Sequence, residues 1–126
     1  MRFPLAVRYA DYDTKGHINN AVYLTYFEIA RSHAWLHAMR QGTDPPFILA
    51  EATVRYVSQA RVAEDLDIEI TTSEIRTKAW VWAYVIRATT DDRIVAEGST
   101  VQVMFDYETR RTIPIPDDLR GLLTAV

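Results

Sequence analysis

Two aspartates, a histidine and two asparagines fall within ten consecutive residues near the start of the chain. They are Asp11, Asp13, His17, Asn19 and Asn20. A carboxylate can act as nucleophile or general base, and a histidine can act as general acid or base. An apolar, helix-like run follows from Ala21, so free backbone N–H groups and the positive end of a helix dipole are expected beside these side chains. Such a position stabilises a developing oxyanion.

Each of these residues also has a plainer interpretation. Aspartates in loops commonly form local turns before a helix, and only one of Asp11 and Asp13 is expected to serve a site. A lone loop histidine such as His17 is often a surface or packing residue. Asn19 is a plausible helix cap, and the functional interpretation of Asn20 uses its backbone N–H instead of its side chain.

Length, net charge and cysteine content limit the classes of protein and of partner that fit this chain. The 126 residues are enough for one domain and too few for two. A net charge of −3 gives no electrostatic reason to expect nucleic acid or an anionic membrane as partner. The absence of cysteine removes disulfides and thiol chemistry, and it fits a cytoplasmic location. No apolar run is long enough to span a membrane, and the first residues are too few and too polar for a signal peptide.

Other reactive motifs are scarce. The sequence contains no GxSxG nucleophile elbow, glycine-rich phosphate loop or GxGxxG fingerprint. His33 and His37 have a helical spacing that can bind a metal, but neither an HExxH glutamate nor a third ligand accompanies them. Glu28 and Arg31 have the spacing of a simple ion pair on a helix. No metal and no cofactor is therefore expected.

The elements that must position these groups begin with a strand and one long helix. The expected order is a strand over Phe3–Tyr9, a loop over Asp11–Gly16, and a helix over Ala21–Met39 that starts near Asn19 or Asn20 and is ended by Gly42. Thr25, Glu28 and Ser32 form the only polar stripe on this helix. A surface helix would show a wider polar face, so we expect a strongly curved sheet, a second subunit, or both around it.

The rest of the chain is predicted to form strands, giving one α+β domain over residues 1–126. Extended segments are expected over Phe47–Val62, Leu66–Thr71, Trp80–Ile86 and Ile94–Phe105, with turns at Asp91-Asp92 and Asp106–Arg111 and a possible helix after Pro116. The segment 80–86 is apolar on both faces, which predicts a central strand. Gly98 indicates the close approach of another backbone or of the helix.

The stretch RYADYDTKGHINNAVYLTYFEIAR, residues 8–31, resembles the opening of the 4-hydroxybenzoyl-CoA thioesterase-like family of hotdog-fold proteins. The family pattern is close to DxDxxGHVNNxxYLxYFExAR, and the chain departs from it only at Ile18. A weaker resemblance continues through RYVSQARVAEDLDIEI, VAEGSTVQVMFD and PIPDDLR. It implies an α+β hotdog fold, in which an antiparallel sheet of five or six strands wraps around one long helix. It also implies a homodimer with a continuous sheet, often paired into a homotetramer.

The resemblance implies roles for individual residues. The second aspartate of DxD is the catalytic carboxylate, which corresponds to Asp13. The first-turn amide that polarises the thioester carbonyl corresponds to Asn20, and the histidine of HVNN corresponds to His17. Apart from the resemblance, Tyr23 is one of several aromatic residues expected in the core, some of which can line an acyl pocket.

Substrate contacts are expected from two further regions. Some family members hold the CoA phosphates with basic residues, which Arg76 and Lys78 match, although the family often has Gly and Ser near this segment. The family also often has Gly-Asp where this chain has Ala63-Glu64. The opposite wall of the site is expected from the strand region 56–61 of a second chain. The residues there are Ser58 and Gln59, toward the acyl group or a water, and Arg61, near the carrier phosphates. The alternative is that Ser58 and Gln59 are ordinary polar strand residues and that the basic side chains are only solvated.

These assignments predict a thioesterase that hydrolyses acyl-CoA or acyl-carrier-protein substrates. Asp13 either attacks the thioester carbonyl or activates a water, and the motif does not separate the two routes. The alternatives are a non-catalytic acyl-thioester binding hotdog protein and a hotdog dehydratase or hydratase. The intact DxDxxGHxNN pattern argues against the first, and the second would need a paired His and acid aimed at the acyl β-carbon.

Overall fold

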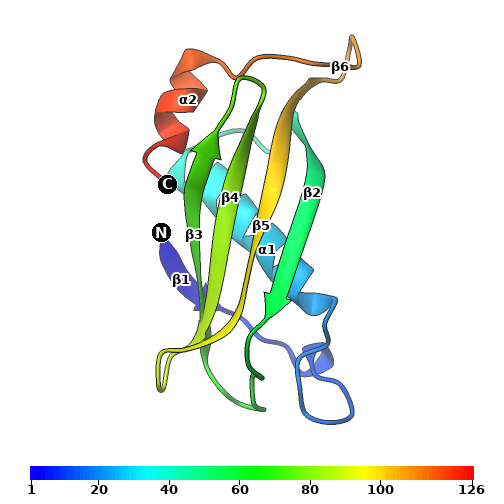
Figure 1. Ribbon diagram of the computed structural model, residues 1–126, viewed down its shortest axis with the longest axis vertical. Coiled ribbons are helices and arrows are strands. Elements are labelled where there is room, and N and C mark those ends of the chain that lie inside the picture. The colour runs from blue at the N-terminus through cyan, green and yellow to red at the C-terminus, as the bar shows by residue number, and fades with distance from the viewer.

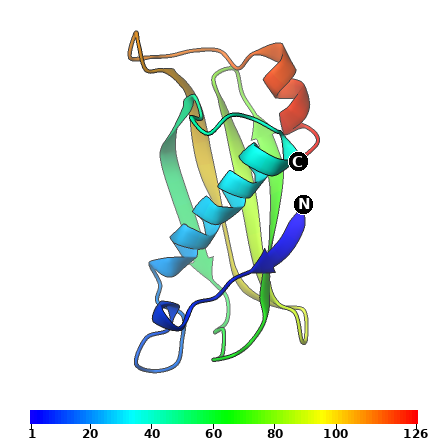
Figure 2. The ribbon, with the colours of Figure 1, turned by 180° about the vertical axis from the view of Figure 1, so that it is seen from behind.

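The structure is a computed structural model that describes residues 1–126. Its elements are β1 (Arg2–Leu5), a 3₁₀ turn (Tyr9–Asp11), α1 (Val22–His33) with a π-helical extension (Ala34–Ala38), β2 (Phe47–Tyr56), β3 (Leu66–Ile75), β4 (Ala79–Ala88), β5 (Arg93–Asp106), β6 (Arg111–Thr112) and α2 (Asp117–Leu123). The strands form one six-stranded antiparallel sheet in the order β1-β3-β4-β5-β2, with β6 paired to β5. The sheet curls around α1, which crosses its inner face diagonally (Figures 1 and 2). The predicted hotdog fold is confirmed.

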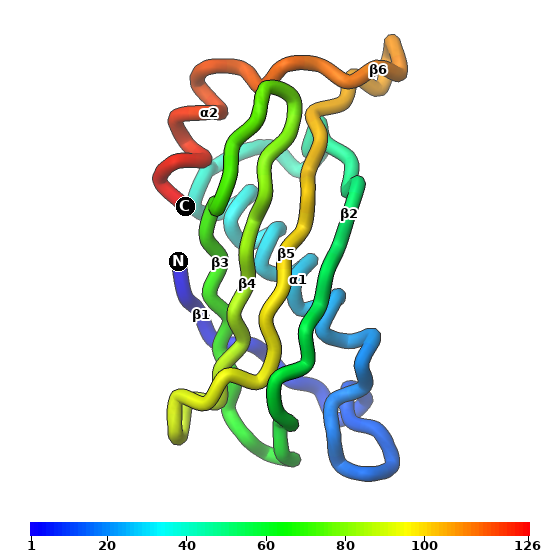
Figure 3. The backbone as a smooth tube through the Cα atoms, viewed as in Figure 1, coloured from blue at the N-terminus to red at the C-terminus, as the bar shows by residue number.

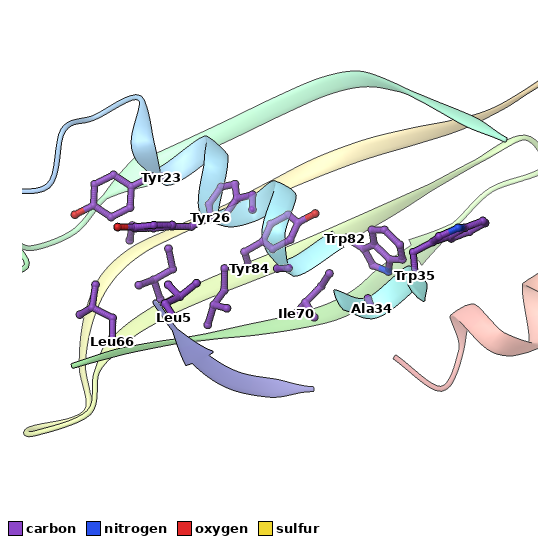
Figure 4. Close-up of a cluster of buried hydrophobic side chains, with 14 of the residues drawn as sticks. Leu5, Tyr23, Tyr26, Ala34, Trp35, Leu66, Ile70, Trp82 and Tyr84 are labelled. Carbon is purple, nitrogen blue, oxygen red and sulfur yellow. The ribbon is translucent and has the colours of Figure 1, made fainter. Parts of the chain in front are cut away.

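The floor under α1 is β4, as the sequence predicted for a central strand. Trp80, Trp82 and Tyr84 alternate along it and are buried, and β4 pairs with β3 on one side and β5 on the other. Phe27 of α1 stacks on Tyr84 with ring centroids 4.3 Å apart. Figure 4 shows the side chains of the helix and the sheet meeting in one cluster. Burial of these large aromatic surfaces holds α1 against the sheet.

A glycine in β5 lets the helix approach closely. A Cβ placed on Gly98 would lie 2.7 Å from the ring of Phe27, and closer still to the carbonyl oxygen of Thr53 on β2. The predicted close approach is therefore confirmed, and both the helix and a neighbouring backbone make it.

The two ends of α1 differ slightly from the prediction. The helix begins at Val22, later than expected. It ends with the wider π-helical turn Ala34–Ala38. The residue that terminates it in the left-handed conformation is Arg40, with φ 53°, and not the predicted Gly42.

The first strand is shorter than predicted. β1 ends at Leu5, short of the predicted end at Tyr9, and the segment Tyr9–Asp11 forms a 3₁₀ turn. The turn is favoured because the carboxylate of Asp11 accepts a hydrogen bond from the amide of Arg8 at 2.9 Å.

The long extended segment predicted up to Val62 is also shorter. β2 ends at Tyr56. The amides of Val57 and Ser58 both donate to the carbonyl of Val95, each at 3.0 Å. This shared acceptor breaks the regular strand ladder, and the chain turns away into a loop.

One face of α1 is not covered by the sheet. The predicted polar stripe of Thr25, Glu28 and Ser32 is exposed, and beside it Leu24 and Ile29 are 44% and 43% exposed. A single chain therefore leaves part of the apolar circumference of the helix in contact with solvent. None of the helices is long and apolar enough to cross a membrane.

The two ends of the sheet carry different connections. The segment between β1 and α1 lies at one end, and the hairpin between β3 and β4 lies at the other end, beside α2 (Figures 1 and 3). The hairpin is tied to the C-terminal region, because the amide of Ile115 donates to the carbonyl of Thr77 at 2.9 Å.

Candidate active site

The loop between β1 and α1 folds tightly around the carboxylate of Asp13. Its Oδ1 atom accepts hydrogen bonds from the amides of Lys15 at 2.9 Å and His17 at 3.1 Å. The amide of Asp13 donates to the carbonyl of His17 at 2.7 Å, and the amide of Gly16 donates to the carbonyl of Asp13 at 3.1 Å. Gly16 has φ +75°, a left-handed conformation that glycine adopts without strain.

This geometry keeps Asp13 ionised. The hydrogen bond from the His17 amide, with a further one from the Lys15 amide, lowers the pKa of the carboxyl below its ordinary value against the opposing effect of desolvation. The side chain is exposed, and its Oδ2 atom makes no hydrogen bond to the protein. One oxygen therefore orients the group and the other is available to attack a carbonyl or to take a proton from water.

Asp11 has a different, structural role. Its side chain is buried, and Oδ2 accepts hydrogen bonds from the Arg8 amide and from the Tyr26 hydroxyl, both at 2.9 Å. Oδ1 accepts two more from the Arg8 guanidinium. Burial alone would raise the pKa of Asp11, but these hydrogen bonds outweigh it and lower the pKa. A continued strand would place residues two apart on the same face. The 3₁₀ turn separates Asp11 from Asp13.

The start of α1 presents a backbone amide beside an aromatic wall. The amide of Asn20 donates no hydrogen bond within the protein, and its carbonyl accepts one from the Tyr56 hydroxyl at 3.1 Å. The side chain of Asn19 accepts the amide of Ala21 at 3.0 Å, in a local turn that delays the helix. Tyr23 is buried with its ring centroid 5.5 Å from that of Tyr56. Burial raises the pKa of Tyr23 to about 12.

The residues predicted on the second wall lie beside the Asp13 loop of the same chain. A pocket there is lined by Lys15, Gly16, His17, Ser58, Gln59, Arg61, Val62 and Arg93. The Tyr12 hydroxyl donates to the carbonyl of Arg61 at 3.4 Å. The sequence assigned the opposite wall of the site to this region of a second chain, and that assignment stays a prediction. Because β2 ends at Tyr56, the following loop folds back onto its own Asp13 loop.

Arg93 organises this wall, and sequence reasoning missed it. Its guanidinium donates to Ser58 Oγ at 3.2 Å and to the carbonyl of Gln59 at 3.0 Å, and it pairs with Glu64 at 2.9 Å. Ser58 Oγ in turn donates to the carbonyl of Ile94 at 2.7 Å. Ser58 is thus held by its own chain. No sequence signal was available, because Arg93 meets partners that are 29 to 35 positions away.

Arg76 and Lys78 lie far from Asp13 within one chain. They belong to the hairpin between β3 and β4, at the opposite end of the sheet from the segment that joins β1 to α1 (Figure 1). Arg76 pairs with Glu74 at 3.0 Å, and Lys78 Nζ donates to Thr112 Oγ1 at 3.4 Å.

The sequence also offered two side-chain pairs on the long helix, one as metal ligands and one as an ion pair, and the structure supports neither role. His33 stacks on Phe3 with ring centroids 4.2 Å apart, and His37 lies 5.1 Å from His33. No group of three or more His, Cys, Asp or Glu side chains is arranged to hold a metal ion. Glu28 and Arg31 do not form the ion pair that their spacing allowed; the ion pairs of the chain lie elsewhere.

Comparison with known proteins decides the family. The profile of the thioesterase-like superfamily matches residues 7–123. This chain belongs to the thioesterase-like superfamily. It is 24% identical over 131 residues to the long-chain acyl-CoA thioesterase FadM of Escherichia coli strain K12, covering 98% of this chain and 96% of FadM. With this family and a hotdog fold, the protein is a thioester hydrolase, as the sequence predicted.

Solved structures share the fold over nearly the whole chain. A thioesterase from Thermus thermophilus in complex with coenzyme A and Zn superposes with a TM-score of 0.86 at 25% identity, covering 98% of this chain and 91% of that one. A 1,4-dihydroxy-2-naphthoyl-CoA thioesterase from Synechocystis superposes with a TM-score of 0.85 at 18% identity, covering 97% and 93%.

Proposed function

We propose that the protein hydrolyses acyl-CoA thioesters, with Asp13 as the catalytic carboxylate and the Asn20 amide as the oxyanion donor. The observation that carries the proposal is the combination of an ionised carboxylate with one free oxygen and an unpaired amide at the start of α1. The acyl-CoA substrate is supported by FadM and by the coenzyme A complex of the Thermus thioesterase.

Two routes of hydrolysis use the same geometry. In one, Asp13 Oδ2 attacks the thioester carbonyl, the thiolate leaves, and water hydrolyses the resulting anhydride. In the other, Asp13 takes a proton from a water that attacks the carbonyl, and the proton passes to the leaving thiolate. In both, the carbonyl oxygen becomes an oxyanion, and one donor such as the Asn20 amide can contribute about 3 kcal/mol of stabilisation. His17 lies in the same loop and is proposed to assist proton transfer.

We also propose that the working form is a homodimer, or a dimer of such dimers. β2 is an edge strand that pairs only with β5, and most of its side chains are exposed. Leu49 and Tyr56 on this strand are 47% and 51% exposed. A long edge of this kind is a template for pairing with another strand, and a second copy of β2 would extend the sheet.

The substitution Asp13→Asn tests the catalytic assignment. We expect kcat on acyl-CoA substrates to fall at least about a hundredfold, because an amide can neither attack the carbonyl nor accept the proton. The matched control is Asp44→Asn, the same chemical change at an exposed aspartate outside the loop. Retention of near-full activity by Asp13→Asn would contradict the proposal. Single-turnover hydrolysis in oxygen-labelled water separates the routes, since label enters Asp13 only if it attacks the carbonyl.

A further inference from the structure

The loop that carries Asp13 is a small hairpin whose two ends are joined at Asp11. The amide of Asn19 donates to the backbone carbonyl of Asp11 at 2.9 Å. One step further in, Tyr12 and Ile18 form an antiparallel bridge, and Ile18 is buried in the core. Asp13 follows directly in this hairpin, so the place of its carboxylate depends on how Asp11 is held.

Asp11 also fixes the hairpin to the start of α1. Asn19, which binds the carbonyl of Asp11, directly precedes Asn20. The carbonyl of Asn19 accepts a hydrogen bond at 3.0 Å from the amide of Val22, the first residue of α1. The proposed catalytic carboxylate of Asp13 and the proposed oxyanion donor of Asn20 therefore lie on either side of a contact made by Asp11. A movement of Asp11 would change their separation.

One buried hydroxyl on α1 holds the side chain of Asp11. The Tyr26 hydroxyl donates to Asp11 Oδ2 at 2.9 Å, and both residues are 1% exposed. Tyr26 lies beside Tyr23 in the cluster of side chains that packs α1 against the sheet (Figure 4). Burial, and then the hydrogen bond to Asp11, raises the pKa of Tyr26 far above its ordinary value. The hydroxyl therefore keeps its proton and remains a donor.

The second partner of the Asp11 carboxylate is exposed. Arg8 donates to it through its guanidinium, but the Arg8 side chain is 70% exposed, so solvent screens the ion pair. A hydrogen bond from a buried donor to an ionised acceptor is stronger, because little water competes for either group. Tyr26 is therefore the main restraint on the side chain of Asp11.

We propose that Tyr26 is a positioning residue for hydrolysis. Its hydroxyl holds Asp11, and Asp11 holds the carboxylate of Asp13 at the distance from the Asn20 amide that the reaction needs. This inference rests on the proposed function and adds to it a residue that acts through another one. A displacement of about 1 Å at a reacting group can lower the rate roughly a hundredfold. One hydrogen bond lost beneath the loop is therefore expected to affect kcat.

Removal of one hydroxyl tests the proposal. Tyr26→Phe is expected to lower kcat on acyl-CoA substrates about tenfold and to change KM less than about twofold, because the hydroxyl orients the attacking group and does not bind substrate. The matched control is Tyr84→Phe: Tyr84 is equally buried, and its hydroxyl shares a hydrogen bond with Thr100 Oγ1 at 2.6 Å in the core. This control loses the same atom and should retain kcat when both variants are assayed well below their melting temperatures. No loss of kcat in Tyr26→Phe, or an equal loss in both variants, overturns the proposal.

Hydrogen exchange shows whether the loop itself loosens. The amides of Lys15 and His17 donate to Asp13 Oδ1. Their exchange is expected to become about tenfold faster in Tyr26→Phe, while the amides of β4 keep their wild-type rates. Tyr84→Phe should leave the two loop amides unchanged. Unchanged loop amides in Tyr26→Phe, or equal acceleration in the loop and in the sheet, contradict a positioning role.

Arg8→Gln provides a second variant that leaves the core intact. It removes the exposed guanidinium from Asp11 and keeps the Tyr26 hydroxyl in place. We expect kcat to fall about threefold, less than in Tyr26→Phe, because an exposed pair contributes less. Arg2→Gln is the control, since Arg2 is also exposed but pairs with Asp67 on β3. If Tyr26→Phe does not fold, these two arginine variants decide the question, and equal kcat values refute the proposal.

The two hypotheses fail in different ways. If the wild-type protein hydrolyses thioesters but Tyr26→Phe and Tyr84→Phe have the same kcat, the positioning role is wrong and the proposed function stands. If the wild-type protein hydrolyses no acyl thioester, the proposed function itself fails. The hydrogen-exchange comparison needs no substrate, so it still decides whether Tyr26 holds the loop.

Discussion

Asp11 and Asp13 carry the same functional group two positions apart, but their surroundings give them opposite roles. Asp11 is buried and uses both oxygens on Arg8 and Tyr26. Asp13 is exposed and uses one oxygen on backbone amides. The DxD spacing alone did not separate the structural carboxylate of Asp11 from the carboxylate that we propose to be catalytic. What separates them is the 3₁₀ turn, whose stability depends on the Asp11 carboxylate.

We therefore expect Asp11→Asn to destabilise the protein by about 2 to 3 kcal/mol at neutral pH, because charged hydrogen bonds at a buried site are lost. The pKa of Asp11 is lowered in the folded state, so its contribution is fully present above the unfolded pKa of about 4 and is lost as the pH falls from there through the lower folded-state pKa. Urea unfolding at neutral and acidic pH measures this, and the difference from wild type should shrink in acid. A pH-independent difference would contradict the assignment to the ionised carboxylate.

At the scale of the elements, the contact between α1 and the sheet depends on Gly98. A methyl group there would meet Phe27 at 2.7 and 2.9 Å and also the Thr53 carbonyl, so Gly98→Ala is expected to cost about 3 kcal/mol. Gly121→Ala is the control: Gly121 lies in α2 with no atom within 4 Å of the added group, and the change is expected to be neutral or stabilising by up to about 1 kcal/mol. Thermal unfolding compares them, and equal melting temperatures would show that α1 tolerates displacement.

The helices and strands also show which parts of the fold the sequence predicts and which it does not. The alternation or double-sided apolarity of residues 66–71, 80–86 and 94–105 predicted three strands correctly, because burial of those faces is repeated along the segment. The ends of β1 and β2 were not predictable in this way. β2 stops because Val57 and Ser58 share the carbonyl of Val95, a partner distant in sequence. The helix terminates at Arg40, whose left-handed conformation has no sequence signal comparable to that of glycine.

The candidate site was predictable where the motif is local and unpredictable where it depends on tertiary contacts. The sequence identified Asp13, His17 and Asn20 because one continuous stretch contains them. It did not show that the loop 58–61 packs against residues 15–17 of the same chain, or that Arg93 holds Ser58 and Gln59 there. A groove between the end of the long helix and the start of β2 is lined by Trp35, Phe47 and Leu49, and no pattern in the sequence pairs a helix end with the strand that follows a proline-rich turn.

At the scale of the whole molecule, antiparallel pairing of two β2 strands in the proposed dimer has a consequence for how the thiol carrier binds. Arg76 and Lys78 lie on the hairpin between β3 and β4, at the opposite end of the sheet from the Asp13 loop of the same chain (Figure 1). In the proposed dimer, antiparallel pairing through β2 would bring the partner's hairpin to the same end as Asp13. Arg61 lies in its own chain beside Lys15, Gly16 and His17 of the loop that contains Asp13. Both subunits can therefore present positive charge to the phosphates of one CoA.

The last prediction tests this arrangement with a pair of substrates. An acyl-CoA and the corresponding acyl-N-acetylcysteamine thioester share the reacting group, but only the first carries phosphates. We expect Arg76→Gln combined with Lys78→Gln, and separately Arg61→Gln, to raise KM for the acyl-CoA about fivefold, because exposed charge pairs contribute up to about 1 kcal/mol each. Neither kcat nor the constants for the phosphate-free thioester should change.

Ionic strength supplies an independent readout. The Debye length falls as salt is added and is about 10 Å at 0.1 M, so salt weakens the attraction between exposed charges. KM of the wild-type protein for acyl-CoA should therefore rise with salt, and KM of the variants should rise less. Arg76 is engaged with Glu74 at 3.0 Å, and binding a phosphate requires it to leave or share that carboxylate, so Lys78 is expected to contribute more than Arg76. Equal changes in KM for both thioesters would place these side chains near the acyl group or in the fold, and would remove them from the carrier site.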